Sequence, residues 1–295
     1  MQVKGLRLAP SIRADGEHTD FSGPADPSEG FAHRYIVGMR VDATSYAEAA
    51  DRIVGWARRR QSRYVCVASV NNVVLARDDD AFASAMNGAD LVTPDGMPLV
   101  WGLRLLGIAS ATRVCGPLLT PLLCQVAAQE GIPVGFYGGT PAVLRDLLAT
   151  VSARFPGLDV AYSFSPPFRA LTAREDGVVR TEIRASGARI LFVGLGAPKQ
   201  ERWMADRIGA MDGVMVGVGA AFDVLAGRTT QAPRWMQEVG LEWMFRLFRE
   251  PRRLWKRYVY GNPRFVVLFG KQVLAAEWAR RGRTEPRSAP KEGRS

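Results

Sequence analysis

Short apolar runs alternate with amphipathic segments along most of the chain. Seven apolar, β-branched runs are typical of strands: Tyr35–Val41, Tyr64–Ser69, Leu91–Thr93, Pro133–Tyr137, Asp159–Ser163, Arg189–Gly194 and Gly213–Val218. Six segments between them have helical spacing: Tyr46–Arg59, Asn72–Met86, Leu118–Glu130, Ala142–Phe155, Arg174–Ser186 and Lys199–Ile208. Apolar strands that alternate with amphipathic helices predict an α/β fold, with a mainly parallel sheet covered by helices on both faces.

The pattern changes after Gly227, where strand-like runs end. Three segments that each begin with a proline predict helices, because proline suits a first helical turn: Pro233–Phe248, Pro251–Tyr260 and Pro263–Arg281. We therefore divide the chain into a flexible leader (1–32), an α/β core (33–228), a basic and aromatic helical appendage (229–282) and a disordered tail (283–295).

The net charge of +10 lies entirely in the last part of the chain. Residues 228–295 contain 16 Lys and Arg against 6 Asp and Glu, and the preceding residues balance. This asymmetry indicates a polyanionic partner, such as nucleic acid, anionic lipid or a diphosphate. No known nucleic-acid-binding motif is visible, and the three cysteines form no zinc or disulfide pattern. We find neither a membrane-spanning segment nor a signal peptide, and a reducing cytoplasmic compartment fits best.

Polar residues follow several of the predicted strands, at the sheet edge where α/β proteins bind ligands. Ser69 and Asn71 follow one strand, where they either cap the next helix or face a ligand. Asp95 follows another, within Pro-Asp-Gly. It is either part of a tight turn or a general base whose pKa is raised by partial burial.

Two glycine turns and an arginine cluster add to these candidates. Gly194 and Gly196 would let backbone amides approach a ligand, and Lys199 with a helix N-terminus would favour a phosphate. Gly217-Val218-Gly219 begins like a dinucleotide fingerprint, but Phe222 occupies the place of its third small residue. Asp78-Asp79-Asp80 is more typical of a solvated helix face than of a metal site. Arginines of the appendage can bind phosphate, meet anionic lipid or simply face solvent.

Six motifs, taken in order, resemble the bacterial WecG/TagA/CpsF glycosyltransferases, family 26 among sugar transferases. They are Val67–Asn71, Ala89–Gly96, Arg113–Gly116, Gly194–Trp203, Gly217–Asp223 and Gly240–Leu247, the last followed by Glu250, Pro251 and Arg253. The resemblance runs from about Tyr35 to Phe269. It implies a Rossmann-like core that is not a dinucleotide enzyme.

The resemblance also implies an inverting, metal-independent reaction without a cofactor. A sugar (N-acetylmannosamine, its uronic acid or glucose) would move from a UDP-sugar to a saccharide on a polyprenyl diphosphate, in exopolysaccharide or other cell-surface polysaccharide synthesis. The enzyme would lie on the inner face of the cytoplasmic membrane, against an anionic surface, with self-association left open.

The same resemblance implies roles for individual residues. Asp95 would be the general base, with Ser69 and Asn71 beside it, and Ser69 stands where the family usually has threonine. Substrate would be bound by residues of the other motifs and of the appendage: Arg113, Gly194, Gly196, Lys199, Gln200, Glu201, Gly219, Asp223, Arg246, Arg253 and Arg257. Two alternatives stay open, an NAD(P)-dependent oxidoreductase and a non-catalytic adaptor that binds membrane or nucleic acid.

Overall fold

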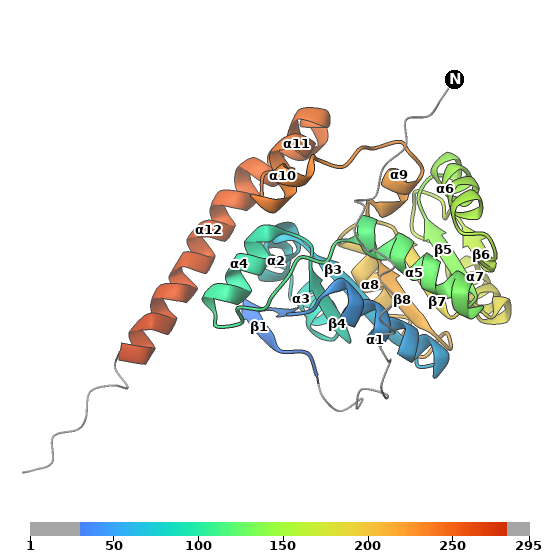
Figure 1. The fold of residues 1–295 in the computed structure, drawn as a ribbon, viewed down its shortest axis with the longest axis horizontal. Coiled ribbons are helices and arrows are strands. Elements are labelled where there is room, and N and C mark those ends of the chain that lie inside the picture. The colour runs from blue at the N-terminus through green and yellow to red at the C-terminus, as the bar shows by residue number, and fades with distance from the viewer. Residues whose placement is uncertain (1–29, 282–295) are drawn as a thin grey trace, which may run out of the picture. The chain divides into compact units, whose positions relative to one another are not determined.

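A computed structural model describes residues 30–281 of the chain. In this part the strands are β1 His33–Ile36, β2 Met39–Asp42, β3 Arg63–Ala68, β4 Leu91–Pro94, β5 Val134–Gly138, β6 Val160–Phe164, β7 Ile190–Gly194 and β8 Val214–Gly217. The helices of the core are α1 Tyr46–Arg58, α2 Val70–Asp78, α3 Asp80–Asn87, α4 Met97–Leu105, α5 Gly116–Glu130, α6 Pro141–Arg154, α7 Ala173–Ser186, α8 Lys199–Ala205 and α9 Ala221–Leu225. The chain continues through α10 Arg234–Glu238, α11 Glu242–Arg249 and α12 Pro251–Arg281 (Figure 1).

Six strands form one parallel sheet, in the order β4-β3-β8-β7-β5-β6. The predicted fold class is therefore confirmed: the molecule is a Rossmann-like α/β protein. Because all six strands run the same way, the turns that follow them lie at one edge of the sheet. Residues 1–29 of the predicted leader (1–32) and the whole predicted tail (283–295) lie outside the described residues, and the four-part division of the chain stays a prediction.

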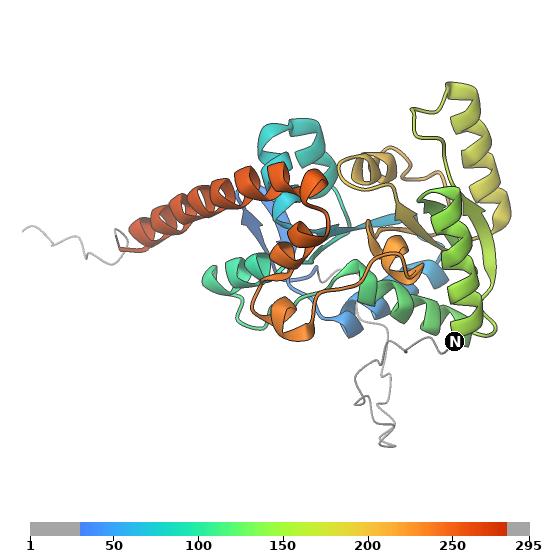
Figure 2. The same cartoon turned by 90° about the horizontal axis from the view of Figure 1, so that it is seen from above.

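Alternate side chains of the strands divide the core into two layers, as the period of two requires. Val65, Phe136 and Phe192 pack on one face with α1, α5, α6 and α9. Cys66 and Leu191 pack on the other with α2, α3, α4, α7 and α8. Figure 2 shows the sheet from its edge, with α2 and α3 on one side and α1 and α5 on the other.

The prediction of one strand over Tyr35–Val41 is wrong. The chain reverses at Val37 and Gly38, which have φ of 52° and 86°, and forms the antiparallel β1–β2 hairpin instead. Glycine adopts such positive φ values at little cost. The apolar residues that resembled a continuous strand, among them Ile36 and Met39, are buried in the second core layer.

The predicted helix Asn72–Met86 is two helices. Asp79 has extended backbone, at φ −143° and ψ 101°, and its carboxylate caps α3 by accepting from the Phe82 amide at 2.9 Å. Asp78 pairs with Arg264 of α12 at 2.5 Å, and Asp79 pairs with Arg202. Asp78 and Asp79 are therefore partly exposed, and they also form ion pairs and a helix cap that join parts of the fold. Helix α4, which follows Asp95 directly, was not predicted.

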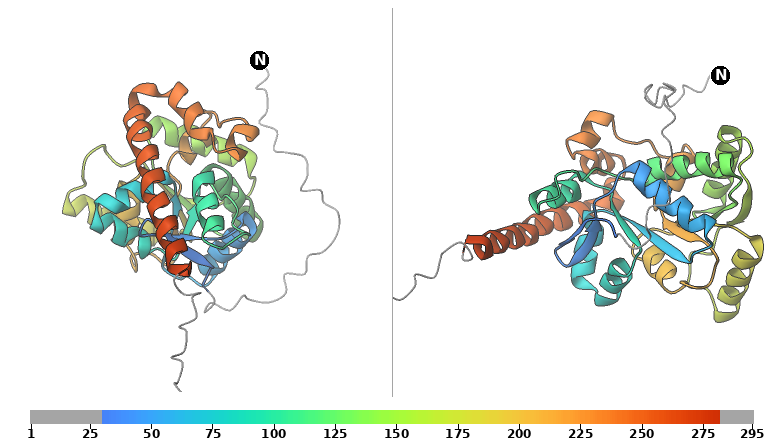
Figure 3. Two further views of the ribbon diagram at one scale, coloured as in Figure 1. Left: turned by 90° about the vertical axis from the view of Figure 1, so that its left-hand side faces the viewer. Right: turned by 60° about the horizontal axis from the view of Figure 1, so that its bottom comes forward.

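The C-terminal helices also begin and end differently from the prediction. The segment Pro233–Phe248 breaks at Gly240, whose φ of 73° ends α10 before α11 begins. The two helices predicted on either side of Pro263 are one, α12. A proline at position 263 removes the bond to the carbonyl of Val259, a residue on the exposed side, where water can replace it. Figure 3 shows α12 running past α2 and α4.

Candidate active site

One cleft of about 2000 Å³ opens at the carboxyl edge of the sheet. Turns after β3, β4, β5, β7 and β8 line one side of it, and α10, α11 and α12 line the other. All fourteen residues predicted for the site line this cleft, although they come from segments far apart in the sequence. The structure thus brings these residues together, while their individual roles stay predictions.

Asp95 is held beside Ser69 by the backbone. The Asp95 amide donates to the Ala68 carbonyl at 2.7 Å, which extends the β3–β4 pairing past the last strand residues. Gly96 then caps α4 with an extended φ of −138°. The carboxylate remains partly exposed in the cleft rather than capping that helix.

Arg113 connects Asp95 to the C-terminal helices. Its Nη2 lies 3.3 Å from Asp95 Oδ1 and 2.5 Å from Glu242 Oε2 on α11, and its Nη1 donates to Gln237 Oε1 at 2.6 Å. Glu242 in turn pairs with Arg246 at 3.1 Å. The C-terminal helices therefore complete the electrostatic surroundings of Asp95.

Burial raises the pKa of Asp95 to about 6, although Arg113 lowers it. The charge on Glu242 adds to the rise, and Arg246 opposes it. A carboxylate with this pKa is ionised at neutral pH and is still basic enough to accept a proton from a hydroxyl during attack.

A chain of buried amides and carboxylates lies under the cleft floor. Asn72 Oδ1 accepts from the Ser69 hydroxyl at 2.9 Å, and Asn72 Nδ2 donates to Glu201 Oε1 at 3.2 Å. Glu201 Oε1 also accepts from Gln200 Nε2 at 2.9 Å, and Gln200 Oε1 accepts from the Gly219 amide at 3.1 Å. Gln200 is 3% exposed and Glu201 is fully buried. The side chains of Gln200 and Glu201 therefore bind neighbouring site residues and present little surface to the open cleft.

Arginines of α11 and α12 cover the opposite side of the cleft. Arg257 approaches the Ser69 hydroxyl at 3.4 Å, and its Nε is buried without a hydrogen-bond partner in the described part of the chain. Burial lowers the pKa of Arg257, with neighbouring Arg246 and Arg253 adding to the effect. A bound anion would relieve both the repulsion and the missing hydrogen bond.

The glycine turns after β7 and β8 fit closely together. A Cβ on Gly194 would lie 2.6 Å from the ring of Phe222, which is buried against Phe136. Phe222 therefore fills the space that a dinucleotide fingerprint would leave to a small residue. Gly196 and Gly219 have φ of 76° and 53°, conformations that glycine permits in tight turns near a ligand.

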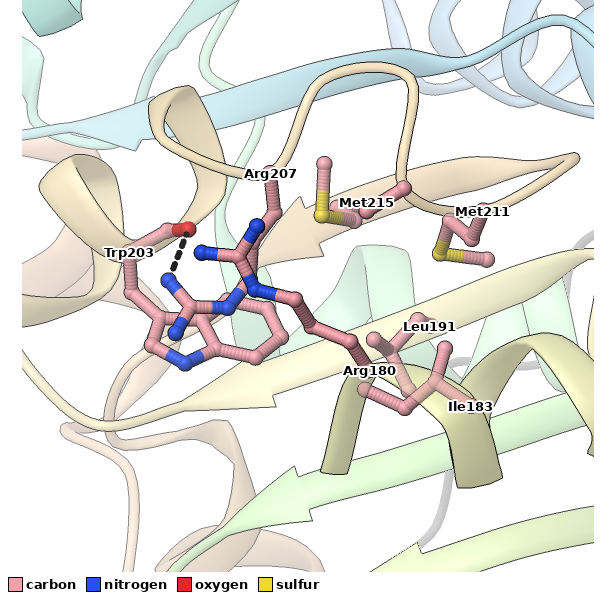
Figure 4. Close-up of a pocket in the computed structure, with 8 residues that line it drawn as sticks. Arg180, Ile183, Leu191, Trp203, Arg207, Met211 and Met215 are labelled. Atoms are coloured by element: carbon pink, nitrogen blue, oxygen red, sulfur yellow. Dashed lines mark hydrogen bonds between the residues drawn. The ribbon is translucent and has the colours of Figure 1, made fainter. Parts of the chain in front are cut away.

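An aromatic stack forms a further wall near β5. Arg207 lies over the ring of Trp203, 4.2 Å from its centroid, and donates to the Trp203 carbonyl at 3.0 Å (Figure 4). Trp203 in turn stacks on Tyr137 at 4.4 Å. The adjoining cavity of about 10 Å³ has room for no more than a water molecule.

Fold and cleft together define a Rossmann-like α/β protein whose candidate ligand site lies at the carboxyl edge of its sheet, around a carboxylate that can accept a proton. The sequence model of the "Glycosyl transferase WecG/TagA/CpsF family" matches residues 34–281. This match covers most of the chain, so the protein belongs to that family and is a glycosyltransferase. The resemblance inferred from the six motifs is confirmed, and the oxidoreductase and adaptor alternatives lose their support.

Three residues of the site had no role assigned from the sequence. Gln237 and Glu242 bind Arg113, and Asn72 joins Ser69 to Glu201. Glu242 lies four residues before Arg246, a helical spacing that could have indicated an ion pair. No sequence signal connects Asn72 with Glu201, because they are 129 residues apart. Among the residues the structure describes, no group of three acidic, His or Cys side chains is arranged to hold a metal ion.

Proposed function

We propose that this enzyme transfers a sugar, with inversion, from a UDP-sugar to a saccharide on a polyprenyl diphosphate in cell-surface polysaccharide synthesis. The observation that carries the proposal is that one cleft holds a proton-accepting carboxylate, Asp95, together with Arg246 of α11 and Arg257 of α12. Family membership supports sugar transfer, and the arginines support a substrate that carries phosphate.

In the proposed reaction, Asp95 accepts the proton of the acceptor hydroxyl as the oxygen attacks the anomeric carbon. Arg113 holds Asp95 in place, because its guanidinium donates to the Asp95 backbone carbonyl at 3.1 Å and to the Asp95 carboxylate at 3.3 Å. A sugar hydroxyl is a weak nucleophile, so removing its proton in the transition state lowers the barrier. Attack on the face opposite the leaving group inverts the anomeric configuration.

The bond between the anomeric carbon and the UDP oxygen breaks in the same step, and negative charge develops on the departing diphosphate. The turn at Gly194–Gly196, with Lys199 beside it, is suited to stabilise that charge, and Gly219 lines the same cleft. Arg246, Arg253 and Arg257 are suited to bind the second diphosphate, on the acceptor. The reaction then needs neither a metal nor a cofactor.

We also propose that the C-terminal helices place the enzyme on the inner face of the cytoplasmic membrane. Phe248 and Trp278 are 78% and 82% exposed, and Arg249, Arg252 and Lys256 are exposed near Phe248. Exposed aromatic and basic side chains on α11 and α12 suit an anionic lipid surface. In the described part of the chain, no helix is long and apolar enough to cross a bilayer.

The test is a transfer assay with a panel of labelled UDP-sugars and lipid diphosphates that carry GlcNAc or glucose, in the presence of anionic liposomes. We expect one donor to give an inverted product with the wild type and almost none with Asp95→Asn. Asp51→Asn is the matched control, because Asp51 is exposed on α1, outside the cleft. Equal transfer by the wild type and Asp95→Asn would overturn the assigned base, and transfer to water alone would overturn the proposed acceptor.

A further inference from the structure

The cleft continues beyond Asp95 as an apolar groove between α4 and α12. On the α4 side its lining residues are Met97, Pro98, Trp101, Gly102 and Leu105. Their spacing places them along one side of the helix. Because α4 begins two residues after Asp95, this apolar side starts at the proposed catalytic carboxylate.

On the α12 side the groove is lined by Val266, Phe269, Gly270, Val273 and Leu274. These residues also follow helical spacing and share one side. The two helices approach at the floor of the groove, where a Cβ on Gly102 would lie 3.3 Å from the ring of buried Phe269. Gln272 fastens α12 beside this floor by donating to the Tyr35 carbonyl at 2.6 Å and accepting from the Val37 amide at 2.7 Å.

The walls of the groove leave much apolar surface uncovered. Trp101 is 43% exposed and Leu105 64%, and Val266 and Leu274 are each 66% exposed. None of these ten lining residues is charged, and only Trp101 has a hydrogen-bonding group in its side chain. A contiguous apolar surface of this kind is characteristic of a binding site for a hydrocarbon or for another apolar surface.

We infer that this groove binds the first isoprene units of the acceptor's polyprenyl chain, an inference that rests on the proposed function. The arginines Arg246 and Arg257 lie in the same cleft as the groove, beside the proposed base, so a diphosphate there would direct its hydrocarbon chain between α4 and α12. Nine helical residues of α4 give the groove a length of about 13 Å. That length accommodates only the beginning of a long polyprenyl chain, and the remainder stays in the membrane.

The position of the groove favours a hydrocarbon that belongs to the acceptor over general contact with the membrane surface. Val267, on the same helix, is 57% exposed but does not line the cleft. It can contact lipid from outside, whereas Val266 faces the groove. An occupant of the groove reaches the reacting centre directly, which suits a hydrocarbon attached to the acceptor diphosphate.

The experiment compares Val266→Asp with its matched control, Val267→Asp, and with Leu105→Asp on the other wall. Acceptors are the same saccharide linked to prenyl, geranyl and farnesyl diphosphate, assayed without liposomes. For the wild type and Val267→Asp, we expect KM to fall about tenfold or more as the chain lengthens. For Val266→Asp and Leu105→Asp, we expect that dependence of KM on chain length to disappear.

The outcomes separate this inference from the proposed function. Sugar transfer with a KM that is independent of chain length would overturn the inference about the groove and leave the proposed function standing. No transfer to any lipid diphosphate by folded wild type would overturn both.

Two further outcomes would also overturn the inference. One is a wild-type dimer that Val266→Asp makes monomeric, which would assign the groove to a second copy. The other is equal loss of liposome binding in Val266→Asp and Val267→Asp with chain-length dependence intact.

Discussion

The two sides of the cleft are built on opposite electrostatic principles. On the core side, Asn72, Gln200 and Glu201 are buried and joined by hydrogen bonds through Glu201 Oε1, while Glu201 Oε2 has no partner in the described part of the chain. On the side of the C-terminal helices, Arg253 is largely exposed and Arg257 retains an unpaired Nε in the described part of the chain. The core side holds a buried carboxyl among amides, and burial raises the pKa of that carboxyl, whereas the arginine side is suited to an anion that arrives with the substrate.

Arg113 joins the two sides, because it contacts Asp95 on one and Glu242 on the other. We therefore expect catalysis to require the C-terminal helices, even though the proposed base belongs to the core. Substitutions on each side should therefore change different measured quantities, and four predictions test that division.

The largest effect is expected from Asp95→Asn. The amide cannot accept the hydroxyl proton, so kcat should fall by about 10²- to 10⁴-fold while the melting temperature changes little. Steady-state kinetics and thermal unfolding, with Asp51→Asn alongside, provide the measurement. A change in KM without a fall in kcat would show that Asp95 takes no part in the chemical step.

A smaller effect is expected from Arg257→Gln on the opposite side. Losing a partly buried guanidinium that contacts Ser69 should lower kcat/KM by about 10- to 100-fold, since hydrogen bonds to charged groups are worth about 1.5–3 kcal/mol. Lys271→Gln on the same helix is the control, because Lys271 is exposed and does not line the cleft. Equal losses in the two variants would indicate a general charge effect rather than a defined phosphate contact.

The pH dependence of kcat/KM should follow Asp95. Its pKa of about 6 means that the carboxylate takes up a proton as pH falls through 6, so activity should fall about tenfold per pH unit below that value. Initial rates between pH 4.5 and 8, checked for folding by circular dichroism, measure the profile. A flat profile through pH 6 in folded enzyme would contradict this assignment.

The smallest effect concerns the buried side alone. Burial raises the pKa of Glu201 above its usual value near 4.5. The unfolded chain therefore releases this proton at lower pH than the folded protein does, and stability declines as pH rises from about 4.5 through the folded-state pKa. Glu201→Gln should flatten this part of the decline, measured as melting temperature against pH.

Exposed Glu182→Gln is the control for this measurement. An unchanged slope in Glu201→Gln would show that Glu201 is ionised in the folded enzyme. The buried chain of hydrogen bonds would then hold a charge, and the contrast between the two sides of the cleft would be smaller.

The sequence was most informative where local pattern decides structure. Six of the seven predicted strands are present, in a parallel sheet, because buried strands need continuous apolar runs. It was misleading at Val37–Gly38, where a hairpin turn lies inside one apolar run, and at Pro263, where a single helix passes through a proline. In both places long-range packing, of the hairpin on the core and of α12 on α2, decided against the local signal.

The sequence by itself determined the α/β class, the family and fourteen of the residues that line the cleft, because strand periodicity and ordered motifs are properties of short segments. Only the tertiary structure decided how those residues act on one another. The contacts of Arg113 with Glu242, of Asn72 with Glu201 and of Arg257 with Ser69 span 129, 129 and 188 positions. The groove between α4 and α12 likewise depends on the fold. Burial and proximity arise when distant segments pack together, and no local pattern encodes them.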